Sequence, residues 1–251
     1  MKNSTFTITT LLCLTILNFN IYAQRDNPRI ILEKSAEVCK SLKSIEYAVM
    51  ITSDDGSGGT VVIAEATIKQ ARMKVKNDNF LPGYFSAKVS MSFSASQGTY
   101  SYTYTGDELL FVDDGKKEIN YIVNPSRMRS FNLLGPPSMI GLPDYSREIP
   151  FEKILANSDS LKMSSDIKIF DENCYSIEVY MTRPNQDGNL ESTCSIYYIS
   201  KKDFLPRGVF GVPLTSTVRI IKTDFTVDKE AFNITIPKGY TEKRITDSTA
   251  K

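Results

Sequence analysis

Hydrophobic and polar residues alternate with a period of two along most of this chain, from about residue 45 to residue 123 and again from residue 175 to residue 225. This alternation is typical of antiparallel strands that bury one face and leave the other in water. Turns rich in Gly and Asp separate the first strands. The strongest strand carries its apolar side chains at Phe85, Ala87, Val89, Met91 and Phe93. The pattern predicts an antiparallel meander with one apolar face.

A segment near the beginning of the chain has a helical period instead. Asn27 is a suitable N-cap, and Pro28 fits a first helical turn. Apolar residues follow at Ile31, Val38 and Leu42, with charged residues on the other side. We expect an amphipathic helix of about four turns whose apolar side must lie on other apolar residues.

Residues 124–163 interrupt the alternation, because prolines and glycines recur there and forbid a regular strand. Residues 151–156 are compatible with a short helix. Apolar residues in so long an irregular segment need an apolar partner. We therefore expect this Pro-rich segment to form a lid, whose apolar residues are Leu133, Leu134, Met139, Ile140 and Leu142.

The second half of the chain returns to alternation. Strands are expected at 175–181, 190–200, 205–212 and 214–225, with a last one at 232–236. The polar residues 241–251 are expected to be a flexible tail. The fold class that follows is α+β and mainly antiparallel β, with a strongly curved sheet that forms an unclosed half-barrel covered by the N-terminal helix and the helical, Pro-rich lid. A closed barrel with a helix plug would produce almost the same pattern.

The first 23 residues have the features of a cleaved signal peptide. Lys2 provides a positive start, an uncharged and largely apolar stretch follows, and Ala23 is a small residue suited to cleavage. The apolar stretch is too short to cross a hydrocarbon core of about 30 Å. We expect an exported, periplasmic protein with one half-barrel domain at 24–240 and no transmembrane segment in the mature chain.

Composition narrows the possible functions. The chain of 251 residues has no His, which removes Ser-His-Asp and Cys-His catalysis and His-ligated zinc. Its net charge is +1, and the mature chain without Lys2 would be neutral, so no global field attracts nucleic acid. We expect no cofactor, no metal and no enzymatic activity. An exported hydrolase with two facing carboxylates remains a remote alternative.

Three cysteines would remain after cleavage, so at least one is unpaired within the chain. Cys174 and Cys194 flank a turn, which makes a cross-strand disulfide tempting. If residues 187–188 form a two-residue hairpin turn, however, Cys174 lies opposite Lys201. The two sulfur atoms are then too far apart to form a bond. The pairing of Cys39 stays open.

Two further motifs favour plain structural roles. The row Tyr100, Tyr102 and Tyr104 could stack a sugar or a base, but its Ser and Thr neighbours favour a solvated sheet face. The Asp-Asp-Gly sequences at 54–56 and 113–115 lack the further oxygen ligands of a calcium loop. We expect these two sequences to be turns.

Several sequence segments together resemble those of the LolA/LolB-like superfamily of periplasmic lipoprotein carriers and their relatives of unknown function. They are the helix at 31–44 that runs into a strand, the hairpin at 104–117, the phrase Ile-Tyr-Tyr-Ile-Ser-Lys-Lys-Asp-Phe-Leu-Pro-Arg at 196–207, and the closing Phe-Asn-Ile-Thr-Ile-Pro-Lys-Gly-Tyr at 232–240. The resemblance covers nearly all of the mature chain. It implies an unclosed β-barrel whose apolar concave face holds acyl chains beneath helices and loops.

The sequence and the resemblance together predict a monomeric carrier of lipid acyl chains or of a lipoprotein. The candidate wall of its cavity consists of Phe85, Val89, Met91 and Phe93, and the lid is the apolar set of the Pro-rich segment. Core packing against the helix is the simpler role for any one of these residues. The alternative function is a non-catalytic scaffold that docks an envelope protein on the same fold.

Overall fold

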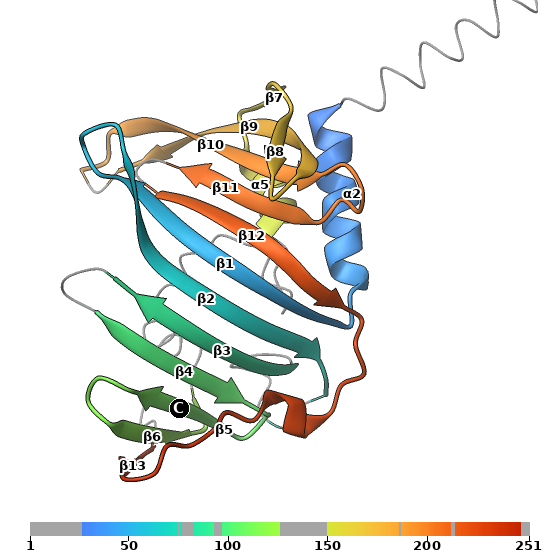
Figure 1. Ribbon diagram of the computed structural model, residues 1–251. Helices are drawn as coiled ribbons and strands as arrows, with labels where there is room; N and C mark the ends of the chain where they lie inside the picture. Colours follow the sequence, from blue (N-terminus) through green and yellow to red (C-terminus); the bar gives the residue numbers. More distant parts are fainter. Residues whose placement is uncertain are drawn as a thin grey trace, which may run out of the picture.

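The computed structural model describes residues 27–74, 76, 83–92, 97–125, 150–185, 187–211 and 214–246. These residues form one continuous sheet with few helices, and the sheet bends strongly about its long direction (Figure 1). The signal peptide expected at 1–23 and the lid residues expected at 133–142 lie outside the described residues.

Thirteen strands make up the described sheet. In chain order they are β1 (Ser44–Asp54), β2 (Thr60–Arg72), β3 (Gly83–Met91), β4 (Gly98–Tyr104), β5 (Glu108–Asp113), β6 (Glu118–Val123), β7 (Ser160–Met163), β8 (Ile167–Ile169), β9 (Glu172–Pro184), β10 (Leu190–Ser200), β11 (Pro206–Gly211), β12 (Leu214–Thr223) and β13 (Thr241–Thr246). Their order in space is β13-β6-β5-β4-β3-β2-β1-β12-β11-β10-β9-β7, with β8 beside β9.

The two outermost strands, β13 and β7, do not pair with each other, so the sheet is unclosed. Every neighbouring pair is antiparallel except β13 with β6, which is parallel. This arrangement confirms the single, curved, mainly antiparallel sheet that the alternation predicts. A closed barrel is excluded for the described strands.

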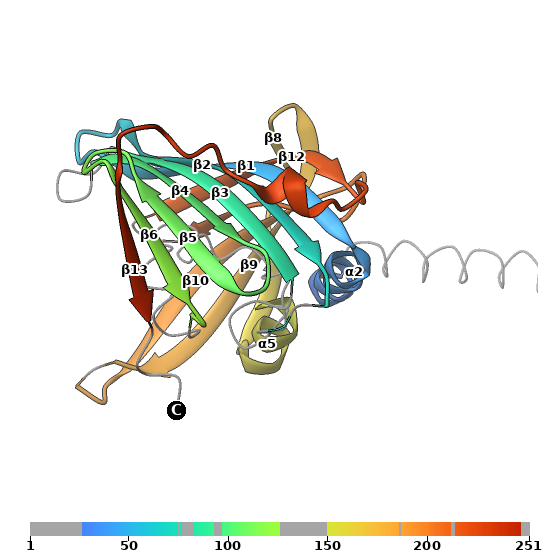
Figure 2. The ribbon, with the colours of Figure 1, turned by 90° about the horizontal axis from the view of Figure 1, so that it is seen from below.

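Two α-helices and one 3-10 helix are described. They are α2 (Pro28–Ser41), α5 (Pro150–Asn157) and η1 (Lys229–Phe232). The helix expected after Asn27 is observed as α2, and the Asn27 side chain accepts a hydrogen bond of 2.9 Å from the Arg29 amide. Ile31, Leu32 and Cys39 point from α2 into the core. Figure 2 shows α2 at one end of the sheet, with α5 beside it on the inner side of the bend.

The C-terminal segment differs from the prediction. Residues 232–236 were expected to be a strand, but Phe232 ends η1, and residues 233–236 follow as an extended segment without strand pairing. This segment crosses the outer side of the sheet (Figure 2). Residues 241–246 were expected to be part of a flexible tail, but they form β13. Ion pairs of 2.6 Å from Lys243 to Glu118 and from Arg244 to Glu108 hold this polar strand, which explains why hydrophobicity did not reveal it.

The hairpin between β9 and β10 differs by one residue from the expected register. Cys174 lies opposite Ser200 instead of Lys201. The cause is Asn185, whose side chain accepts hydrogen bonds from the amides of Asp187 and Asn189 and so closes a wider turn. The conclusion drawn from the register holds, because the three cysteines of the described chain are all free.

Candidate functional site

The inner face of the sheet is an apolar wall. Its middle is built by β2, β3 and β4, whose register places Ala66 beside Val89 and Phe85 beside Tyr104. Phe85 and Val89, both predicted as wall residues, are fully buried in the main hydrophobic cluster. Met91 is partly buried and packs against the same cluster. The fourth wall residue, Phe93, lies outside the described residues.

The wall continues over further strands, which sequence reasoning did not include. Buried members of the same cluster on these strands are Tyr47, Val49, Ile51, Leu109, Ile122, Ile177, Val179, Ile199 and Val218. The described helices contribute to this cluster at one end of the sheet only. The apolar surface is therefore a property of the whole bend and not of one strand.

The tyrosine row was expected to be a solvated face, and this expectation is wrong. Tyr102 and Tyr104 are buried on the inner wall, and the Tyr102 ring stacks on Phe111 at a centroid distance of 5.0 Å. The reason is the register, which aligns Tyr102 with Ala87 and Tyr104 with Phe85. Burial raises the pKa of Tyr102 above its ordinary value. The tyrosines therefore belong to the wall.

A polar group on β2 interrupts this apolar wall. Gln70 shares its side of β2 with Ala66 and Ile68 and lies opposite Phe85 on β3. Its side-chain oxygen is buried without a hydrogen-bond partner. Such a group is costly in apolar surroundings, because it has lost its water without compensation. A donor group on a ligand would satisfy it.

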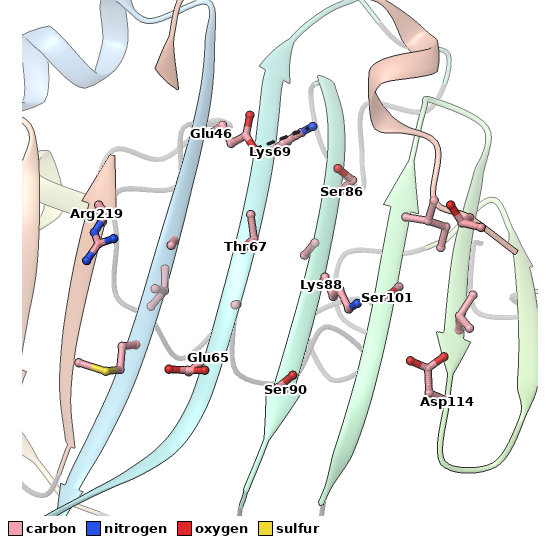
Figure 3. Close-up of a pocket in the computed structure, with 18 of the residues that line it drawn as sticks. Glu46, Glu65, Thr67, Lys69, Ser86, Lys88, Ser90, Ser101, Asp114 and Arg219 are labelled. Carbon is pink, nitrogen blue, oxygen red and sulfur yellow. Dashed lines mark ion pairs between the residues drawn. The ribbon is translucent and has the colours of Figure 1, made fainter. Parts of the chain in front are cut away.

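The outer face of the sheet is polar and also hollowed. A cavity of about 950 Å³ lies there, which we call the outer trough. Figure 3 shows side chains of its floor: Glu46 and Lys69 form an ion pair of 3.9 Å, and Lys88 lies beside Ser101. The alternation predicts a solvated face at these positions and does not predict a cavity. No sequence signal marks it, because its walls come from distant segments.

A buried ionic cluster was also missed. Arg207 on β11 is only 2% exposed, and its guanidinium contacts Glu172 at 2.8 Å and Asp203 at 2.6 Å. It also donates to the carbonyl oxygen of Leu205 at 3.2 Å. Ser200 donates a further hydrogen bond to Glu172. All donors of the cluster point inward at protein partners, so its role is to join β9, β10 and β11.

The Asp-rich turns use their oxygens internally. The Asp55 carboxylate accepts hydrogen bonds from the amides of Ser57 and Gly59 at 2.8 and 2.9 Å. The Ser57 hydroxyl and these amides lower the pKa of Asp55. These bonds are the turn chemistry that the sequence predicts. Within the described ranges, no group of three or more Cys, Asp or Glu side chains is placed to hold a metal ion.

Comparison with known proteins identifies the fold. No protein-family model and no curated protein matches the sequence. The structure is similar to that of LprF from Mycobacterium bovis, with a TM-score of 0.51 and 10% identity, over 85% of this chain and 97% of that one. It also resembles the lipoprotein LppX from Mycobacterium tuberculosis, with a TM-score of 0.45 and 15% identity over 80% and 96% of the two chains.

A LolA superfamily protein from Nitrosomonas europaea is matched with a TM-score of 0.30 and 11% identity, over 83% of this chain and 98% of that one. Of these three structures, LprF shares the overall fold with this chain at a TM-score above 0.5. In the described chain, neither α-helix has the length and apolar character needed to cross a membrane. The unclosed, curved sheet and the LprF match show that this chain shares the fold of LprF.

Proposed function

We propose that this protein is a periplasmic carrier that holds lipid acyl chains, free or as part of a lipoprotein, against the inner face of its half-barrel. The observation that supports this most directly is the continuous apolar wall, which extends from β6 through β1 to β9. An acyl chain needs apolar surface and shape, and no reactive group. The protein would carry its cargo without chemical change.

The energy available is sufficient for such binding. Removing a methylene group from water contributes about 0.8 kcal/mol, so a chain of about 16 carbons offers about 12 kcal/mol before costs. Ordering the ligand and opening the site take back several kcal/mol. The remainder corresponds to micromolar or tighter affinity. The unpartnered oxygen of Gln70 adds a polar group that a ligand hydroxyl or amide would satisfy.

In this proposal α2 and α5 cover one end of the wall, and the Pro-rich segment covers the rest. The proposed lid residues remain Leu133, Leu134, Met139, Ile140 and Leu142, and Phe93 would extend the wall beyond Met91. Cleavage after Ala23 would release the carrier into the periplasm as a monomer. Export is consistent with the signal-peptide features of the first 23 residues.

Displacement of a fluorescent fatty-acid probe from the purified mature chain tests the proposal. Met91 and Ser92 are neighbours, and Met91 packs against the core whereas Ser92 is exposed. Met91→Glu places a charge on the wall and should weaken probe binding at least tenfold. Ser92→Glu adds the same charge outside the wall and should leave probe binding unchanged.

A chain that binds no probe and yields no lipid on extraction would contradict the carrier function. The alternative, a non-catalytic scaffold that docks an envelope protein, would then be the better account. Equal effects of Met91→Glu and Ser92→Glu on probe binding would also contradict the carrier function, because probe binding would then not depend on the inner wall.

A further inference from the structure

The outer trough lies on the face of the sheet that the proposed carrier function does not use. We propose that it is a second binding site, and that its ligand is a neutral, polyhydroxylated chain, namely an oligosaccharide. Three features of the trough point to this class of ligand: its walls, the aromatic ring at one end and the balance of its charges.

Two segments that rise above the sheet give the trough its walls. At one end the turn between β8 and β9 contributes Phe170, and at the other the segment after η1 contributes Ile234 and Pro237. Between them the floor runs across six neighbouring strands, from β12 to β5. At about 4.8 Å per strand this is about 24 Å. A plain solvated sheet face would have no such walls.

The β8–β9 turn that carries Phe170 is unusual. Ile169 pairs with Glu172, so Phe170 and Asp171 form a two-residue turn in which both have positive φ, 47° and 66°. Asn and Gly are the residues that favour this conformation, and a bulky side chain there is strained. Phe170 nevertheless occupies this position, where it is 40% exposed and borders the trough. Strain retained at an exposed aromatic ring points to a functional position.

Arg219 on β12 supports this ring on one side, with its guanidinium carbon 4.7 Å from the ring centroid. The stack fixes the orientation of Phe170 at the end of the trough. Sugar rings present apolar C–H faces that pack on aromatic rings, while their hydroxyl groups need polar partners around the edge. The trough offers both kinds of surface, because hydroxyl and charged side chains follow the ring along the floor.

The charges of the floor are balanced. Lys69, Lys88 and Arg219 are matched by three carboxylates, those of Glu46, Glu65 and Asp114. Such a surface offers no net attraction to polyanions such as nucleic acid. It offers acceptors and donors in alternation, and each sugar hydroxyl is both a donor and an acceptor. Figure 3 shows this alternation across strands, with Glu65 near Ser90 and Lys88 near Ser101.

A peptide fits this trough less well than a sugar chain. The backbone N–H and C=O groups of the floor are used in the ladders between β12, β1, β2, β3 and β4. A peptide lying across these strands therefore gains no strand pairing, which is the usual source of affinity for extended peptides on sheets. Recognition must come from side chains, as it does for sugars.

Titration of the mature protein with maltohexaose, cellohexaose and chitohexaose, followed by calorimetry, tests the proposal. At least one of these should bind with a dissociation constant of millimolar or tighter. Phe170→Asn removes the ring and keeps a residue that favours positive φ, so the turn should fold. It should weaken binding at least tenfold. Phe210→Ala removes an aromatic ring that is exposed on β11 outside the trough, and should have no effect.

Three results of the binding titrations would overturn the proposal. They are the absence of binding to all three sugars, unchanged binding to Phe170→Asn, and binding of an extended neutral heptapeptide that is equal to that of the best sugar. Displacement of the fatty-acid probe by the sugar would also overturn it, because the sugar would then occupy the inner face. The carrier function is tested separately, since Met91→Glu should leave sugar binding intact.

Discussion

Phe85 on β3 lies directly opposite Tyr104 on β4, and both side chains are buried on the inner face of the sheet. The pair stands at the centre of the apolar wall. Removing the Phe85 ring should leave a cavity that the stiff sheet cannot close. Phe85→Ala should therefore lower the free energy of unfolding by about 3–5 kcal/mol, measured by urea denaturation. A loss below about 1 kcal/mol would mean that the ring is not packed in the wall.

The burial of Arg207 predicts that removing its two carboxylate partners costs more stability than removing Arg207 itself. Arg207 is almost fully buried, whereas Glu172 and Asp203 keep more than a third of their side-chain surface in water. The double change Glu172→Gln with Asp203→Asn leaves a buried cation uncompensated, and should cost about 3–5 kcal/mol. Arg207→Met leaves two carboxylates that water can reach, so its cost should be clearly smaller. Urea denaturation of both variants checks the order, and the opposite order would contradict the burial of Arg207.

The C-terminal segment should contribute strongly to stability through Phe232. This side chain is fully buried on the outer side, packs edge-on against Tyr84 and lies 6.3 Å from the ring of Phe225. Thr103 donates a hydrogen bond to the Phe232 carbonyl oxygen. Phe232→Ala should cost about 3–5 kcal/mol and should increase amide hydrogen exchange in β13.

A matched control for this segment is Ile236→Ala, because Ile236 is exposed in the same segment. This change should alter stability by less than about 0.5 kcal/mol. If both substitutions had the same small effect, the segment would not be anchored by Phe232.

The cysteines predict a loss of stability at alkaline pH. Burial raises the pKa of the Cys39 thiol from 9.0 to about 12, and that of Cys174 from 9.0 to about 11. The pKa of each thiol is higher in the folded state than in the unfolded state. The contribution of these thiols to stability is therefore complete below pH 9.0 and is lost as the pH rises from there. In this range each thiol should reduce stability by up to about 1.4 kcal/mol per pH unit.

Urea denaturation at several pH values above and below the unfolded-state pKa measures this effect. Cys39→Ala should decline less steeply with pH than the natural chain, whereas Cys194→Ala, at an exposed position, should decline in parallel with it. Parallel curves for all three proteins would contradict the burial of the Cys39 thiol.

Local sequence patterns predict most of the sheet because a strand with one buried face must alternate. Residues 85–91 and 175–181 show this clearly, and both lie in observed strands. Asn27 and Pro28 likewise mark the start of α2 by local chemistry. β13 could not be predicted in this way, because its pairing depends on the ion pairs of Lys243 and Arg244 with distant strands.

The sequence predicts those residues of the candidate site whose position follows from alternation within a single strand. Phe85 and Val89 follow from alternation within β3, whereas the inward direction of Tyr102 depends on its register with Ala87 on another strand. The outer trough combines the turn at Phe170 with a segment after η1, more than sixty residues later. A periodic pattern describes neighbouring residues only, so it does not predict that these two distant segments lie at opposite ends of the same trough.

Mass spectrometry of lipids extracted from the protein, after purification from its native envelope, tests the inner-face account most directly. The account predicts recovery of about one acyl-bearing ligand per chain from the natural protein and from Ser92→Glu, and little or none from Met91→Glu. Recovery of no lipid from a folded natural protein, or equal recovery from all three proteins, would contradict it.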